Sequence, residues 1–165
     1  MPARPVIVNN TPLVALWVLG RLDLLRELYG AVLIPQAVYE EFLATEHALR
    51  QAALENAPWI KSTPLANPQR ARVYIGLDQG EAEVLALAEE RAARLVIIDE
   101  LKGRRYAQRL GLPLTGTLGV LLLARERGLI SQLAPLLAEL QDAGLYLSPA
   151  LVAQVLRLAG EEYLG

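Results

Sequence analysis

Acidic and amide side chains follow two runs of residues that the sequence predicts to be buried strands. The apolar run 95–98 stops on Asp99. The first such run, 6–8, stops on Asn9. β-Branched runs of this kind are typical of strands covered on both faces, and open parallel sheets bind ligands beyond the carboxyl ends of their strands. We therefore expect Asp99 and Asn9 to lie where chemistry takes place.

Glu41 lies on a predicted helix whose apolar residues form one stripe. Val38, Glu41 and Phe42 share that stripe by helical spacing. An acid on the core side of a helix is costly unless it is paired, hydrogen-bonded or bound to a metal. Two interpretations follow: Glu41 is a site residue, or it lies at the boundary of the core and reaches solvent or an arginine.

Glu81 leads a similar stripe through Val84 and Leu85, whereas Glu83 is expected on a solvated face. The segment begins with Asp78, and an acid three residues later fits the start of a helix with a capping box. Acids in a first turn are also favoured by the helix dipole. Glu81 therefore has two interpretations, a capping acid and a site acid.

Asp99 and Asn9 also have structural interpretations. An aspartate after a strand can cap the helix that follows it, here from Leu101 onward. Asn9 fits a turn or a cap, because Pro12 shortly after it suits a first helical position. Four polar residues expected at one edge of a sheet favour a shared site over four separate caps.

A site of this kind calls for a divalent cation. Several acids in one crevice repel one another unless a cation neutralises them, and oxygen ligands suit Mg²⁺ or Mn²⁺. The sequence has no cysteine and a single histidine, His47, which excludes thiol nucleophiles, cysteine zinc sites and multi-histidine sites. The pattern therefore predicts a hydrolytic site built on oxygen ligands.

Strand-like runs alternate with helical patterns, which is typical of βαβ units and a mostly parallel sheet. The fold class is therefore α/β, with a proline-containing excursion over 58–77. The predicted strands are 6–8, 31–34, 95–98 and 112–114, with Trp59-Ile60 as a short edge strand. The predicted helices are 12–19, 22–29, 36–45, 47–56, 80–93, 102–110, 116–127, 131–143 and 149–158.

The chain of 165 residues suits one domain, 1–165, in which 130–165 form a C-terminal helical extension. Hydrophobic residues make up 53%, which favours covered helices and a dimer or partner surface. The longest apolar stretch, 12–20, is well short of the ~20 residues that span a bilayer, so we expect no membrane span and a cytoplasmic protein. A net charge of −2 means that RNA binding needs a local basic patch or a bridging cation.

Five segments together resemble the PIN domain, and within it the compact prokaryotic PIN-like proteins related to toxin–antitoxin endoribonucleases. Their order and spacing carry the resemblance, which covers most of the chain. It implies a three-layer α/β/α sandwich with a mostly parallel central sheet. The segments are VIVNNTPL from residue 6, IPQAVYEEF from 34, LDQGEAE from 77, VIIDE from 96 and LTGTLG from 114.

The resemblance implies hydrolysis of RNA phosphodiester bonds that depends on Mg²⁺ or Mn²⁺. By motif, the family's catalytic and metal-ligating residues fall on Asn9, Glu41, Glu81 and Asp99. Asn9 replaces an aspartate, and Glu81 replaces what is more often an aspartate. Asn9 can still ligate through its carbonyl oxygen but brings no negative charge, so we expect weaker metal binding and lower activity than an aspartate gives.

Substrate contacts are expected just beyond the acidic site. Thr117 resembles the polar residue that often completes the family's pocket. Arg104 and Arg105 are candidates for phosphate contact, because arginine forks suit phosphate, and a solvated basic helix face is the alternative. Glu100 offers a further oxygen ligand or is simply exposed.

The leading hypothesis is a metal-dependent endoribonuclease that acts on RNA as the toxin of a toxin–antitoxin pair, with an antitoxin protein as partner and a homodimer as its assembly. The alternative is a degenerate PIN-like module, weak or inactive, that binds RNA or protein, and Asn9 discriminates between the two. A nucleotide-binding protein is disfavoured because the chain has no Walker-type loop. The apolar segments 130–140 and 151–158 fit either internal packing or a partner surface.

Overall fold

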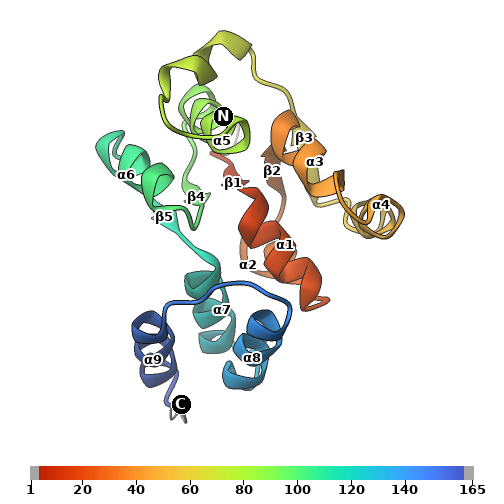
Figure 1. Ribbon diagram of the computed structural model, residues 1–165, viewed down its shortest axis with the longest axis vertical. Helices are drawn as coiled ribbons and strands as arrows, with labels where there is room; N and C mark the ends of the chain where they lie inside the picture. The colour runs from red at the N-terminus through yellow and green to blue at the C-terminus, as the bar shows by residue number, and fades with distance from the viewer. Residues whose placement is uncertain (1–3, 162–165) are drawn as a thin grey trace.

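The computed structural model describes residues 4–161 and shows a parallel sheet between layers of helices (Figure 1). The strands are β1 (Val6–Val8), β2 (Val32–Pro35), β3 (Ile60–Thr63), β4 (Leu95–Ile97) and β5 (Leu114–Thr115). Within the described residues these five strands pair in the order β3-β2-β1-β4-β5, and every pair is parallel. The α/β class is confirmed, and β3 is the edge strand predicted near Trp59-Ile60.

Helices connect the strands close to where the periodicity predicts them. In the part of the chain that the structure describes, none of them is long and apolar enough to cross a membrane. A short 3₁₀ helix, η1 (Pro68–Val73), lies within the predicted excursion. The helices are α1 (Asn10–Val18), α2 (Asp23–Tyr29), α3 (Gln36–Leu43), α4 (His47–Glu55), α5 (Gln79–Arg91), α6 (Leu101–Arg109), α7 (Thr117–Glu126), α8 (Ala134–Asp142) and α9 (Pro149–Leu158).

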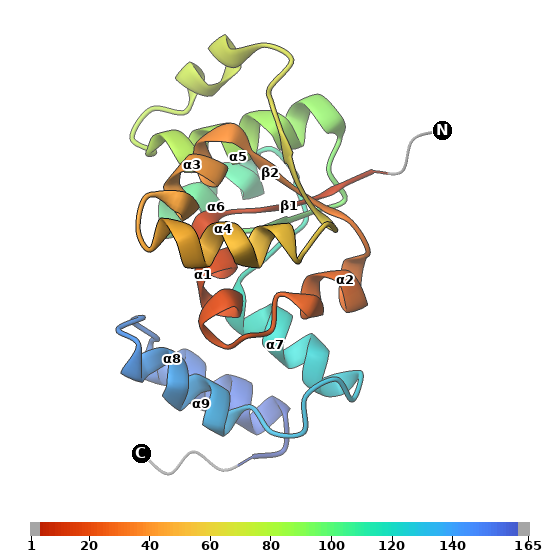
Figure 2. The ribbon, with the colours of Figure 1, turned by 90° about the vertical axis from the view of Figure 1, so that its right-hand side faces the viewer.

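The layers are those of an α/β/α sandwich. Figure 2 shows α5 on one side of the sheet and α1, α2 and α7 on the other. Helix α5 contacts β1, β2 and β4, and its residues from Val84 to Ala88 are all buried. The three residues of β1 are fully buried as well, because both faces of the sheet are covered. The three-layer architecture that the resemblance implies is therefore confirmed.

The strand order creates a crevice at the middle of the sheet. The chain proceeds from β1 outward to β2 and β3, and then returns to pair β4 with the other side of β1. Val8 pairs with Ile97, so the residues after β1 and β4 leave neighbouring strands at one edge. The amide of Asn9 donates to the Ile97 carbonyl at 2.9 Å. Ligands in open α/β sheets bind at such a topological switch point.

The predicted C-terminal extension, 130–165, contains α8 and α9, and its residues 162–165 lie outside the described part. Helices α7, α8 and α9 gather at one end of the molecule (Figure 1), and α9 contacts α7. The Glu161 carboxylate accepts hydrogen bonds from the backbone amides of Leu133 and Ala134, at 2.7 and 3.0 Å. Glu161 therefore caps the start of α8 from the far end of the extension.

The Glu161 cap predicts a measurable contribution to stability. Glu161→Ala removes both hydrogen bonds and leaves the α8 amides without this acceptor, so the free energy of unfolding should fall by about 1 kcal/mol. Urea unfolding followed by circular dichroism measures the change. The matched control is Glu139→Ala on the exposed side of α8, for which we expect less than about 0.5 kcal/mol. Equal losses for the two variants contradict the capping role.

Candidate functional site

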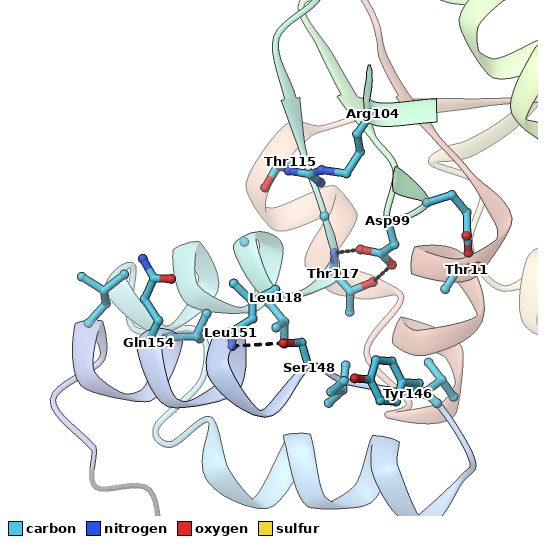
Figure 3. A pocket seen from close by; sticks show the side chains of 17 residues that line it. Thr11, Asp99, Arg104, Thr115, Thr117, Leu118, Tyr146, Ser148, Leu151 and Gln154 are labelled. Atoms are coloured by element: carbon cyan, nitrogen blue, oxygen red, sulfur yellow. Dashed lines mark hydrogen bonds between the residues drawn. The ribbon is translucent and has the colours of Figure 1, made fainter. Parts of the chain in front are cut away.

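Asp99, which follows β4, bonds to the start of α7. Its Oδ1 accepts from the Thr117 amide at 2.7 Å, and its Oδ2 accepts from the Thr117 hydroxyl at 2.6 Å (Figure 3). The N-cap of α6 is Glu100. The interpretation of Asp99 as the cap of the helix that follows it is therefore wrong, because the carboxylate caps α7 from a neighbouring strand. Two short hydrogen bonds hold both of its oxygens in place.

Gly116 makes room for this arrangement. A Cβ at Gly116 would lie 2.5 Å from Asp99 Oδ1, which is closer than real Cβ atoms come to other atoms, and 3.1 Å from Arg104 Nη1, which is a tight contact. The Arg104 side chain is half-buried, and its Nη1 donates to the Ile98 carbonyl at 2.8 Å. The Asp99 carboxylate and the Arg104 guanidinium can therefore both lie close to the backbone here because residue 116 has no side chain.

A cleft of about 680 Å³ opens beside Asp99. Its polar side includes Asp99, Glu100, Arg104 and Thr117, and its other side is formed by residues 145–158 (Figure 3). The volume lies within the range of roughly 300–1,000 Å³ that is usual for ligand pockets. The cleft therefore has the size and the polar groups of a ligand site.

Glu81 is buried at the start of α5, as its stripe predicts. Glu81 is only 8% exposed. The side chain of Asp78, the N-cap of α5, accepts a hydrogen bond from the Glu81 backbone amide at 2.8 Å. Burial first, and then the charges of Asp78, Glu100 and Glu41, raise the pKa of Glu81 from 4.5 to about 7, and the Asp78 backbone amide offsets a part of this rise. The capping start and the buried acid are both present, so the two interpretations of this segment are compatible.

Glu41 agrees with the second of its two interpretations, a residue at the boundary of the core that reaches solvent. Val38 and Phe42 of the stripe are fully buried, but Glu41 is exposed. Its carboxylate reaches the start of α5. Glu41 Oε1 lies so close to Gly80 that a Cβ on that glycine would be only 2.8 Å away. Partial loss of hydration, and then the charge of Asp78, raise the pKa of Glu41. The long side chain leaves the apolar stripe and joins the acids at α5.

Glu83 differs from its prediction, which placed it on a solvated face. The residue is half-buried, and its carboxylate accepts from the Ala37 amide at 3.0 Å and from Gln79 Nε2 at 2.7 Å. Because Ala37 lies in the first turn of α3, Glu83 ties the start of α3 to the start of α5. That tie holds the helix of Glu41 against the helix of Glu81.

Asn9 occupies the N-cap position of α1 and is 3% exposed. Among the described residues its side chain makes no capping hydrogen bond, so helix capping does not explain why an asparagine side chain is buried here. Asn9, Glu41 and Glu81 lie outside the lining of the 680 Å³ cleft, whereas Asp99 lines it. The site therefore has two parts: Asp99 lies in the cleft, and Glu41 and Glu81 lie at the start of α5. Asn9 belongs to neither part and lies at the end of β1.

The donor chemistry of these two parts suits a divalent cation. Oxygen atoms are the donors throughout, and repulsion among Glu41, Glu81 and Glu100 is the kind of cost that a bound cation removes. Within residues 4–161, no three histidine, cysteine, aspartate or glutamate side chains lie together as a group that could hold a metal ion. The residues present fit a cation in donor type and in charge, but the described carboxylates are not gathered into one set of ligands.

The residues expected to contact the substrate lie partly inside the cleft and partly outside it. Arg104, Glu100 and Thr117 line the cleft, whereas Arg105 is exposed and lies outside its lining. The closeness of Gly116 to Asp99 could not be predicted, because strand neighbours are not visible in a linear sequence. Tyr146 of the cleft wall gave no signal either, because it stands in a segment without a regular apolar period.

The fold and the site define an α/β protein with acids at a topological switch point. A family model described as a PIN domain matches residues 5–161. The chain therefore belongs to the PIN-domain family. PIN domains form a superfamily of ribonuclease-type nucleases, and they generally use divalent metal ions and act on RNA. A comparison with curated proteins finds no match.

The raised pKa of Glu81 predicts a pH-dependent loss of stability. The unfolded chain releases the Glu81 proton near pH 4.5 and the folded chain only near pH 7, so stability falls as the pH rises through this window. Glu81→Gln removes the ionisation and should raise the free energy of unfolding at pH 8 by up to roughly 3 kcal/mol, with no gain at pH 4. Urea unfolding in EDTA measures both values.

The matched control for this prediction is Glu139→Gln, an exposed glutamate on α8. We expect it to follow the wild-type pH dependence. If Glu81→Gln also follows the wild-type curve from pH 4 to pH 8, Glu81 does not carry the raised pKa.

Proposed function

We propose that this protein is a divalent-metal-dependent endoribonuclease that hydrolyses RNA phosphodiester bonds. The observation that carries the proposal is the Asp99 carboxylate, held by two hydrogen bonds to Thr117 at the switch point of the sheet. The repelling acids beside it and membership of the PIN-domain family support the same chemistry.

Asn9, Glu41, Glu81 and Asp99 are the residues that would hold Mg²⁺ or Mn²⁺. When bound, the cation supplies a water of lowered pKa and neutralises charge on the phosphoryl oxygens. Thr117 orients Asp99, so that this acceptor needs little reorganisation during the reaction. Glu81, with a pKa of about 7, is close to half-protonated at neutral pH, and it would have to be ionised to hold a cation.

Arg104 is the proposed contact for the phosphate. A guanidinium has five N–H donors, and the Ile98 carbonyl takes one of the Arg104 donors while fixing the direction of the group. The other donors suit the oxygens of a phosphate at Asp99. Arg105, the next residue and exposed, is the proposed contact for the RNA backbone outside the cleft. Glu100 adds an oxygen at the cleft rim.

Asn9 favours a second candidate function, a weakly active or inactive PIN-fold module that binds RNA or protein. Its amide contributes one charge fewer than an aspartate at the same strand end, so the site attracts a cation less strongly. The toxin role, the antitoxin partner, the homodimer and a cytoplasmic location are further parts of the proposal, and they rest on the resemblance of the five sequence segments.

The central test is RNA cleavage by the purified chain in MnCl₂, followed on denaturing gels with an end-labelled single-stranded RNA. We expect the wild type to cleave, and Asp99→Asn to lower the rate by at least about 100-fold because a charged ligand is lost. Asn9→Asp should raise the rate roughly tenfold and lower the Mn²⁺ concentration needed for half-maximal cleavage.

Asn56→Asp is the matched control, since Asn56 is an exposed asparagine at the end of α4. It should leave cleavage unchanged. Absence of cleavage by both the wild type and Asn9→Asp contradicts the nuclease and leaves the binding module as the function.

Metal binding has its own readout in thermal stability. A cation at 100 times its dissociation constant adds about 2.7 kcal/mol to the folded state, which corresponds to a rise in Tm of several degrees. The rise between EDTA and MnCl₂ should be larger at pH 8 than at pH 6, because Glu81 must lose its proton to bind. Asp99→Asn should reduce the rise. A Tm that does not respond to MnCl₂ in either the wild type or Asn9→Asp contradicts the metal site.

A further inference from the structure

One wall of the 680 Å³ cleft is apolar and takes no part in the acidic site. It comes from the segment between α8 and α9 and from one face of α9. Of the described residues on this wall that line the cleft, none carries a charge, whereas the opposite side carries Asp99, Glu100 and Arg104. The apolar members of the wall are Leu145, Tyr146, Leu147, Leu151, Val155 and Leu158.

Tyr146 is the most exposed of these side chains, at 85%. Figure 3 shows it across the cleft from Thr117 and Asp99, with Gln154 further along α9. The backbone on both sides of Tyr146 is held: Gly144, with φ of 92°, follows the end of α8, and Ser148 caps α9 by accepting from the Leu151 amide. The aromatic ring is therefore displayed toward the cleft from an anchored segment.

The two sides of the cleft differ in charge, so each side fits a different part of a nucleotide. A phosphate fits the side of the cleft that holds Arg104 and the acids that suit a cation. The wall that bears Tyr146 offers no cation to a phosphate, so it fits an uncharged, flat group instead. A base has such a face, and base stacking on aromatic side chains is the usual way in which proteins hold single-stranded nucleic acid.

We propose that Tyr146 and the apolar wall form a binding site for one nucleobase of single-stranded RNA, adjacent to the phosphate held at Asp99. The proposal rests on the ribonuclease function and adds the feature of the substrate that the wall recognises. It requires an unpaired base, because a base inside a duplex is already stacked on both faces.

The test measures binding of two short oligoribonucleotides to the full chain in CaCl₂, with their integrity checked on gels. One carries a single 2-aminopurine, whose fluorescence is quenched by stacking, and the other has an abasic site at that position. Tyr146→Ala should weaken binding of the first about tenfold and remove the quenching, while binding of the abasic oligomer stays unchanged. Tyr146→Phe keeps the ring and should remain within about twofold of the wild type.

Ile75→Ala is the control for an exposed apolar side chain outside the cleft, since Ile75 is 81% exposed. It should bind both oligomers as the wild type does. Because Tyr146 is exposed, Tyr146→Ala should keep the wild-type Tm, which shows that the fold is intact.

Three results overturn the base site. Unchanged binding and quenching in Tyr146→Ala, with RNA cleavage by the wild type intact, leave the ribonuclease in place and show that Tyr146 does not stack on a base. Equal weakening of both oligomers shows that Tyr146 contacts the backbone and no base. If the wild type neither binds nor cleaves RNA, the proposed function itself fails, and the base site fails with it.

Discussion

The pairing of β4 with β1 is the constraint on which the rest of the structure depends. The chain must leave β3, cross the sheet through α5 and return beside β1, and the register of Val8 with Ile97 then brings Asn9 and Asp99 to one edge. Both strands are buried on two faces, so a slip by one residue would turn a side chain meant for one helical layer toward the other. The position of Asp99 is therefore set by the packing of the whole core and not by its own neighbours in sequence.

Acidic side chains are concentrated at this edge, and their mutual repulsion lowers the stability of the folded state. Glu81 is buried among apolar residues of α5, and Asp78, Glu100 and Glu41 all disfavour its ionised form. A protein selected for stability alone gains by replacing such an acid, since a buried charge without a partner is expensive. The retained cost is typical of functional sites, where groups with shifted pKa values cluster. A divalent cation is the simplest agent that turns this repulsion into attraction.

Helix α7 links the acidic site to the far wall of the cleft. Its first residue, Thr117, bonds to Asp99, and its body contacts α9, which bears much of that wall. The same helix thus sets the position of the carboxylate and the position of the apolar surface across from it. Beyond α7, the hydrogen bonds that Glu161 accepts from the start of α8 tie the end of α9 to α8. The width of the cleft is therefore a property of α7, α8 and α9 together.

The sequence by itself determined the elements and one buried acid. Alternation of apolar runs located the strands and helices, the stripe through Val84 located Glu81 in the core, and the spacing from Asp78 located the start of α5. These are local features, because the periods of helices and strands act over a few residues. Only the tertiary structure decided that Asp99 bonds to Thr117, that Glu41 leaves its stripe and that the cleft has an apolar wall. Each of these depends on residues distant in sequence, and their contact is set by how the layers pack.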